Sequence, residues 1–224
     1  MKRAFAFRAV LVFAAVLSIS KPAFASSFTL NQSGCCGIGP FGNVTLSQVD
    51  IDTVAVLVDL NSGIGFVDTG NGPPGNHPDF AWNLVGAPAG VSVSIVQSGA
   101  DGWTFYDRHA SPITMSNGYG TYQFALYCNG GPSCGPGGRQ PNFGPLEFHV
   151  TLPGITENSF VANAAGSIFV ADIIDGYPNG FTGLVRTTAP DREITITAVP
   201  EPATLTLVGM GLFGVARRAR RKMR

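Results

Sequence analysis

Positive charge is nearly missing from the middle of this 224-residue chain. No lysine occurs between Lys21 and Lys222, and the only lysines or arginines within residues 26–198 are four arginines. The same segment holds 13 of the 14 acidic residues, so its formal net charge is −9. A segment of this charge repels polyanions, which argues against nucleic acid and anionic lipid as partners and favours cations or neutral polymers. The four arginines are Arg108, Arg139, Arg186 and Arg192.

Recognisable catalytic motifs are missing as well. The chain has no G-x-S-x-G, H-E-x-x-H or P-loop pattern, and His77, His109 and His149 are typical of turn or surface positions. His109, Asp107 and Ser116 could form a catalytic trio, but a chain of this length offers such combinations by chance. We therefore expect no enzyme activity and no cofactor.

Two pairs of aspartates are the remaining candidates for metal binding. Asp50 with Asp52, or Asp172 with Asp175, could bind calcium together with backbone carbonyls. Neither pair follows the D-x-[DN]-x-[DN]-G loop, and isolated carboxylates mostly lie in water. We expect these four side chains to be exposed at strand ends and expect no metal site.

Cysteine is scarce, with four residues in the whole chain. Cys128 and Cys134 flank the loop "NGGPS", which can bring them within disulfide distance, and we predict this bridge first. Cys35 and Cys36 are adjacent, and a bridge between neighbours is strained. In the rival pattern each of them therefore pairs with one of the distal cysteines. A zinc site is disfavoured because the spacing lacks C-x2-C.

The N-terminus has the pattern of a secretory signal. Lys2, Arg3 and Arg8 precede an apolar run from Ala9 to Ile19, and Ala23-Phe24-Ala25 follows. This order of basic, apolar and small residues predicts cleavage after Ala25, read through Ala23 and Ala25. The alternative is an uncleaved membrane helix, which the shortness of the apolar run disfavours.

Between the two ends the sequence is typical of β-strands. In "PLEFHVTLPG" the apolar residues Leu146, Phe148, Val150 and Leu152 alternate with polar ones, which predicts one buried and one solvated face. "VSVSIVQ", "YGTYQFALY" and "REITITAV" repeat the alternation, whereas "VAVLVDL" and "SIFVADII" indicate more fully buried strands. We predict an all-β domain, an antiparallel β-sandwich or a jelly-roll-like body.

Aromatic side chains suggest a binding surface. Trp103, Tyr119 and Tyr127 are the candidates for stacking against sugar rings, because flat apolar rings suit pyranose faces. Within "YGTYQFALY", Tyr119 and Tyr127 lie on the face that we expect to be exposed. Packing in the core is the alternative for all three, and it is the favoured one.

The C-terminus combines Pro-Glu-Pro, an uncharged run and a basic cluster. Ala203 to Ala216 contains 14 uncharged residues, which rise about 21 Å as a helix against roughly 30 Å of hydrocarbon. Flanking residues extend this reach enough to predict a single transmembrane helix. Basic residues near the end predict a cytoplasmic C-terminus. They are Arg217, Arg218, Arg220, Arg221, Lys222 and Arg224.

In order and spacing, Val199–Arg224 resembles the PEP-CTERM sorting signal of proteins exported by Gram-negative bacteria. The resemblance implies that exosortase, a membrane cysteine transpeptidase, recognises Pro200, Glu201 and Pro202. It further implies a transient hold in the inner membrane and delivery to the cell surface or extracellular matrix. The segment "SFVANAAGSIFVADIIDGYPNGFTGLV" is similar to segments of proteins with this signal, many of which are associated with exopolysaccharide and with biofilm or floc formation.

These features divide the chain into three parts. We expect a signal peptide at 1–25, an exported acidic β domain at 26–198 and the sorting signal at 199–224. The expected function is that of a non-enzymatic surface or matrix protein. Its expected partners are exosortase, the inner membrane during sorting, and exopolysaccharide. Two alternatives stay open: a glycan-active enzyme or carbohydrate-binding module at the cell surface, and a permanent single-span anchor.

Overall fold

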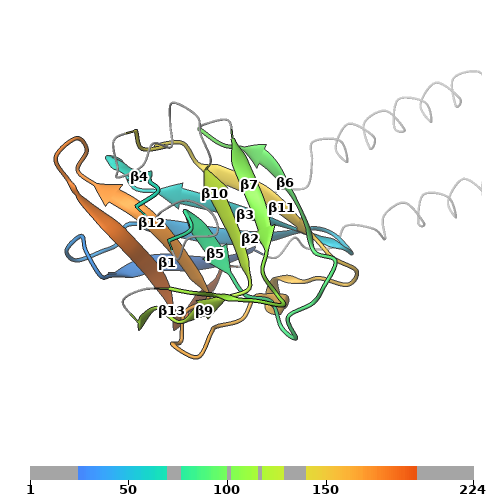
Figure 1. Cartoon of the computed structure of the whole chain (residues 1–224). Coiled ribbons are helices and arrows are strands. Elements are labelled where there is room, and N and C mark those ends of the chain that lie inside the picture. The colour runs from blue at the N-terminus through green and yellow to red at the C-terminus, as the bar shows by residue number, and fades with distance from the viewer. Residues whose placement is uncertain (1–24, 70–76, 100–101, 116–117, 129–139, 196–224) are drawn as a thin grey trace, which may run out of the picture. The chain divides into compact units, whose positions relative to one another are not determined.

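The computed structural model describes residues 25–69, 77–99, 102–115, 118–128 and 140–195, with only the backbone described from 189 onward. Over these residues the chain is all-β, and its strand pairs are antiparallel, which confirms the predicted fold class at that level (Figure 1). No helix in the described part is long and apolar enough to cross a membrane. The predicted transmembrane helix lies outside the described residues, as does the predicted signal peptide up to residue 24.

The named elements are thirteen strands and one short 3-10 helix. In chain order they are β1 (Ala25–Ser33), β2 (Gly42–Asp50), β3 (Thr53–Leu60), β4 (Ile64–Phe66), β5 (Phe80–Trp82), β6 (Ser92–Gln97), β7 (Trp103–Asp107), β8 (Ile113–Thr114), β9 (Thr121–Tyr122), β10 (Phe124–Cys128), β11 (Leu146–Thr151), η2 (Glu157–Ser159), β12 (Phe169–Asp175) and β13 (Phe181–Thr195).

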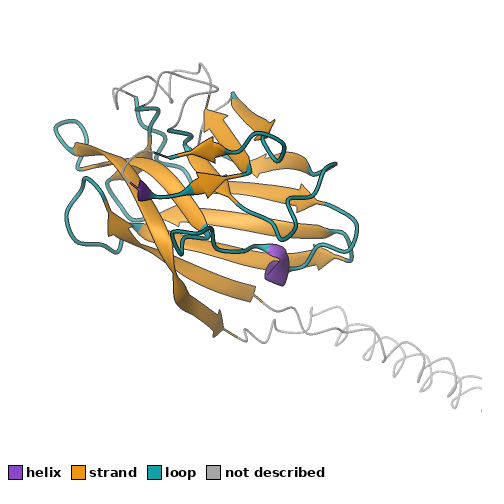
Figure 2. Ribbon diagram, turned by 60° about the horizontal axis from the view of Figure 1, so that its bottom comes forward, coloured by secondary structure: helices purple, strands orange, loops and turns teal. Residues whose placement is uncertain are grey.

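Eleven of these strands form one sheet rather than the two separate sheets of a simple sandwich. Its order is β6-β11-β3-β2-β1-β13-β12-β5-β10-β7, with β4 paired to β12, while β8 and β9 form a small hairpin. The sheet curls into a nearly closed, barrel-like layer (Figure 2). The residues from 24 to 195 belong to one compact unit.

β13 joins the two halves of this sheet. Its first residues pair with β12, from Asp175–Phe181 to Val170–Arg186. Its later residues pair with β1, from Ser33–Val185 to Ala25–Thr195, with two irregularities in register. A 15-residue strand can serve two partners in succession because it bends where the register shifts. The sheet therefore folds over itself at β13.

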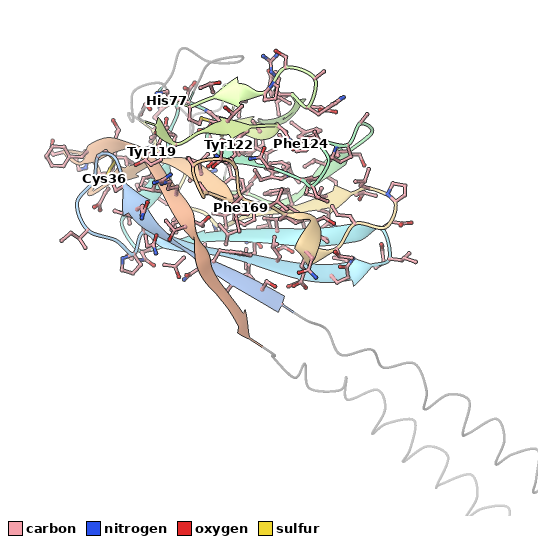
Figure 3. The ribbon with its side chains drawn as sticks, turned by 90° about the horizontal axis from the view of Figure 1, so that it is seen from below. Cys36, His77, Tyr119, Tyr122, Phe124 and Phe169 are labelled. Atoms are coloured by element: carbon pink, nitrogen blue, oxygen red, sulfur yellow. A yellow bond between two sulfur atoms is a disulfide. The ribbon has the colours of Figure 1, made fainter. Side chains whose placement is uncertain are left out.

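The interior is filled from both halves of the sheet by aromatic and aliphatic side chains. Trp82 of β5 lies 5.1 Å from Phe148 of β11, ring centroid to ring centroid, and Phe28 of β1 lies 5.3 Å from Phe169 of β12. Figure 3 shows Phe124 and Phe169 among the side chains of this interior. The predicted alternation in β11 is confirmed, since Leu146, Phe148 and Val150 are fully buried.

A second apolar cluster lies on the other face of β5, β10 and β12. It contains Ala81, Ala125 and Val170 from those strands, covered by Tyr122 and by Ile113 of the β8–β9 hairpin. The Tyr122 hydroxyl donates to Ser167 Oγ over 2.7 Å, and burial raises the pKa of Tyr122 to about 12. This side of the sheet is therefore covered as well.

Cys35 and Cys36 are joined to each other in the turn between β1 and β2. The rival pattern, in which each pairs with a distal cysteine, is therefore wrong: a short turn after β1 accommodates the neighbour bridge, and Ser33 Oγ accepts hydrogen bonds from both backbone N–H groups. Cys128 is disulfide-bonded. Cys134 lies outside the described residues, so its pairing with Cys128 stays a prediction.

The aromatic interior generates a stability prediction. We expect Phe148→Ala to lower the free energy of unfolding by about 3–5 kcal/mol, because it leaves a cavity between Phe80 and Trp82. Phe181→Ala is the matched control, since that ring is 74% exposed and its removal should cost less than about 0.5 kcal/mol. Urea unfolding followed by tryptophan fluorescence measures both. Equal losses in the two variants would contradict the assignment of the core.

Candidate functional site

The most unusual polar group of the domain lies where β12 changes partner. One edge of β12 pairs with β5 over Phe169–Ala171 and with β4 over Ile173–Asp175. Asp172 is the residue between the two stretches: its N–H donates to the Asp79 carbonyl oxygen over 3.1 Å, and its carbonyl oxygen accepts from Val67 N–H. The segment that leaves β4 and the segment that enters β5 therefore meet at Asp172.

Two carboxyl groups are buried at this point. Phe80 pairs with Ala171 across the antiparallel strands, so Asp79, just before Phe80, faces Asp172, just after Ala171. Residues that face each other in this way have side chains on the same face of the sheet. Both side chains are fully buried. Asp79 Oδ2 accepts from Cys128 N–H over 2.9 Å. Oδ1 of each residue is buried and has no hydrogen-bond partner among the described residues.

Asp172 also holds the chain that leaves β4. Its Oδ2 accepts from Thr69 N–H over 2.9 Å and from the Thr69 hydroxyl. His77 closes the group, with Nδ1 lying 3.2 Å from Thr69 Oγ1 and 3.7 Å from Asp172 Oδ2. Figure 3 labels His77. Residues 69 and 77 are thus held together at one carboxylate.

The electrostatics of the group follow from burial. Desolvation raises the pKa of the Asp79 carboxyl well above its usual range; the Cys128 N–H opposes this, and Asp172 and Asp68 add to it. Asp172 raises the pKa of His77, and partial burial opposes it. Burial also raises the pKa of Tyr127. Tyr127 follows Leu126, the partner of Phe80, and therefore lies opposite Asp79. Burial next to Asp172 therefore favours the neutral form of Asp79.

This arrangement suits holding a proton better than reacting with a polymer. A buried carboxylic acid beside a carboxylate avoids two adjacent charges in a medium of low dielectric constant. Neither carboxyl group is exposed to a polysaccharide chain. In the described part of the chain, no group of three or more His, Cys, Asp or Glu side chains is placed to hold a metal ion. The expectation that Asp172 is an exposed strand-end carboxylate is therefore wrong, because its strand is buried on both faces.

Asp50, Asp52 and His109 make hydrogen bonds at the surface. Asp50 Oδ1 accepts from Asp52 N–H over 2.8 Å, and Asp52 Oδ1 accepts from Gly154 N–H over 2.7 Å. His109 Nδ1 lies 2.5 Å from Asp107 Oδ1 at the surface. Ser116 lies outside the described residues, so only the His109–Asp107 contact of the trio is described.

The three predicted sugar-contact residues are mostly covered. Tyr127 is 1% exposed and Tyr119 is 6% exposed, so these two rings pack in the core, the favoured alternative, and the assignment of their face to solvent is wrong. The β8–β9 hairpin and its neighbours cover this face, and Tyr119 packs under Arg186, whose Cζ lies 4.9 Å from the ring. Trp103 is half-buried against Phe66, with ring centroids 5.5 Å apart.

Three other aromatic side chains are exposed near one end of the domain. Phe143 is 49% exposed, Tyr177 is 44% exposed and Phe181 is 74% exposed. The rings of Phe143 and Tyr177 meet edge to face with centroids 5.8 Å apart, and Tyr177 and Phe181 lie on the β12–β13 hairpin, drawn in orange in Figure 1. We call these three residues the aromatic tip. The motif "DGYPNGF" signals a turn but not the exposure of its rings, so sequence reasoning missed them.

The predicted processing residues lie largely outside the described part of the chain. Ala23, the Pro200-Glu201-Pro202 triplet and the basic cluster from 217 to 224 belong to this group. Ala25 is described: it is the first residue of β1 and pairs with Thr195 of β13 and Ser47 of β2. The two ends of the described domain therefore lie side by side in one ladder.

Comparison with known proteins identifies one segment. Residues 198–222 match the family model described as the PEP-CTERM protein-sorting motif. Only residues 196 and 197 separate this segment from the end of β13. No curated protein and no solved structure matched the chain.

The buried carboxyl pair predicts an unusual dependence of stability on pH. Because folding raises the pKa of Asp79, the folded state binds a proton that the unfolded chain releases above about pH 4, and stability falls as pH rises from there through the folded-state pKa. Asp79→Asn keeps a neutral acceptor for Cys128 N–H, so the variant should be more stable than the parent at pH 7 and similar to it near pH 4.

Thermal unfolding from pH 4 to pH 8 measures this effect. Asp59→Asn is the control, because Asp59 is exposed on β3 and its change should leave the curve in place. A loss of stability at pH 7 in Asp79→Asn, larger than at pH 4, would contradict the neutral assignment.

Proposed function

We propose that this chain is a non-enzymatic surface or extracellular-matrix protein that associates with exopolysaccharide. The proposal rests on the C-terminal PEP-CTERM sorting motif. The motif implies an exported protein that exosortase processes and that is held in the membrane transiently. It is the single observation that carries the proposal. The β domain that precedes the motif is then the part that is displayed.

The surface of the domain supports a neutral polymer as the partner. Within residues 26–198 there are 13 acidic residues and four arginines, which disfavours polyanions. The aromatic tip supplies exposed apolar rings, whereas many other aromatic rings of the described residues are buried. Exposed rings next to polar groups suit the faces of pyranose units.

A glycan-active enzyme is the second candidate, and one observation favours it. Asp79 and Asp172 face each other across β5 and β12, and glycoside hydrolases use two carboxyl groups. Both are fully buried, whereas catalytic carboxyl groups must reach the glycosidic bond. Release of reducing ends from the polysaccharide by the parent protein, abolished in Asp172→Asn, would favour this alternative.

If exosortase recognises the Pro-Glu-Pro triplet, a change in the triplet should alter where the protein is found in the cell. In Glu201→Ala we expect the protein to stay in the inner membrane at full length, because the triplet is the segment that exosortase recognises. Cell fractionation and intact mass measurement of the parent and the variant, in cells with and without the transpeptidase, test this. Glu147→Ala, the same substitution within β11, is the control and should be sorted normally. Unchanged location and mass in Glu201→Ala would indicate a permanent anchor.

The aromatic tip predicts binding. Co-sedimentation of the exported protein with exopolysaccharide from the same cells should weaken at least about fivefold in the double variant Tyr177→Ala, Phe181→Ala, since each ring contributes on the order of 1 kcal/mol. Ile51→Ala is the control, because Ile51 is 81% exposed but lies between β2 and β3. Equal binding by all three proteins would remove the aromatic tip from the proposal.

A further inference from the structure

β6 is an open edge of the sheet. It stands at one end of the strand order and pairs with β11, and no other described strand pairs with it. Its side chains are exposed except for Val93, which is half-buried against the core; Val96 is 52% and Ile95 36% exposed. The strand at the other end, β7, is better covered, because Trp103 packs on Phe66 and Phe105 packs on Trp82.

The usual protections of an edge strand are largely missing from β6. Natural edges carry lysine, proline, charged side chains or bulges that prevent another strand from adding to them. The sequence of β6 is SVSIVQ, which contains none of these residues. One irregularity in register falls next to Val96, whereas Ser92 to Ile95 pair regularly with Thr151 to Phe148. At least four residues of regular backbone thus present an unpaired edge.

The charge of the domain favours a second copy of the same chain as the partner of this edge. Residues 80–100 contain no charged side chain, although residues 26–198 carry a net charge of −9. Two copies of so acidic a domain repel each other over most surfaces, because carboxylates meet carboxylates. When β6 meets β6 of another copy, serine, valine and isoleucine meet the same residues. Glu147 and His149, the nearest ionisable side chains in the ladder, belong to the next strand inward.

The geometry also suits two copies. Antiparallel pairing of one strand with itself has two-fold symmetry, so it is self-complementary and closes as a dimer. The backbone N–H and C=O groups of the edge then find partners, and Val96 loses its exposure to water. We propose that β6 is a self-association edge, through which two copies of this protein join their sheets as β11-β6-β6-β11.

Measurement of mass against concentration tests this proposal. The exported protein, purified in its native processed form, should show a monomer–dimer equilibrium by sedimentation velocity, with a dissociation constant in the micromolar to millimolar range that small interfaces give. In Val96→Lys the constant should rise at least about tenfold, because a lysine on an edge strand opposes the addition of another strand. Val49→Lys is the matched control: Val49 is 51% exposed at the end of β2, and its variant should dimerise like the parent.

A covalent probe keeps the test independent of the lysine variant. Ser94→Cys lies in the regular part of β6 and should form an intermolecular disulfide on mild oxidation, whereas Val49→Cys should not. A monomer at every concentration, or a dimer that Val96→Lys leaves unchanged and Ser94→Cys does not cross-link, would overturn the proposal. So would association that occurs only after polysaccharide or another protein is added.

Discussion

The pairing of β13 with β12 on one side and with β1 on the other is the constraint on which the rest of the structure depends. It joins two halves of one sheet and turns their apolar faces toward each other, so that Trp82 and Phe148 meet in one interior. The same strand ends two residues before the sorting motif. A displaced β13 would therefore disturb both the closure of the sheet and the end of the domain that leads into the motif.

Closure of the sheet also explains the buried acidic group. One edge of β12 pairs with β13, and the other pairs with β5 and then with β4. Asp172 lies between the residues that pair with β5 and those that pair with β4. Its carboxylate binds Thr69 and lies beside His77, so it fixes the chain that leaves β4. Asp79 faces it, and burial raises the pKa of the Asp79 carboxyl well above its usual range. The group lies at a topological junction, where the segments around β4, β5 and β12 meet.

The outer surface then divides by chemistry. The domain is acidic, the aromatic tip exposes three rings, and β6 offers backbone groups without charged side chains. A matrix protein, the role proposed above for this chain, needs few specific contacts if each is repeated over many copies, because linked weak contacts add avidity. The aromatic tip and the uncharged edge of β6, in the roles proposed for them, would be contacts of this kind.

The sequence by itself determined the β class and the sorting signal. Alternation in "LEFHVT" has a period of two, and the PEP-CTERM pattern consists of consecutive residues, so both are local properties. Only the tertiary structure decided which strands meet. Alternation assigned the face of Tyr127 to solvent, and Asp172 was expected in water because charged groups mostly lie there. Both are buried, because Tyr127 packs in the cluster that the β8–β9 hairpin covers and β12 is buried on both faces. Burial, the pairing of Asp79 with Asp172 and the open edge at β6 depend on contacts between distant segments, and local patterns do not encode such contacts.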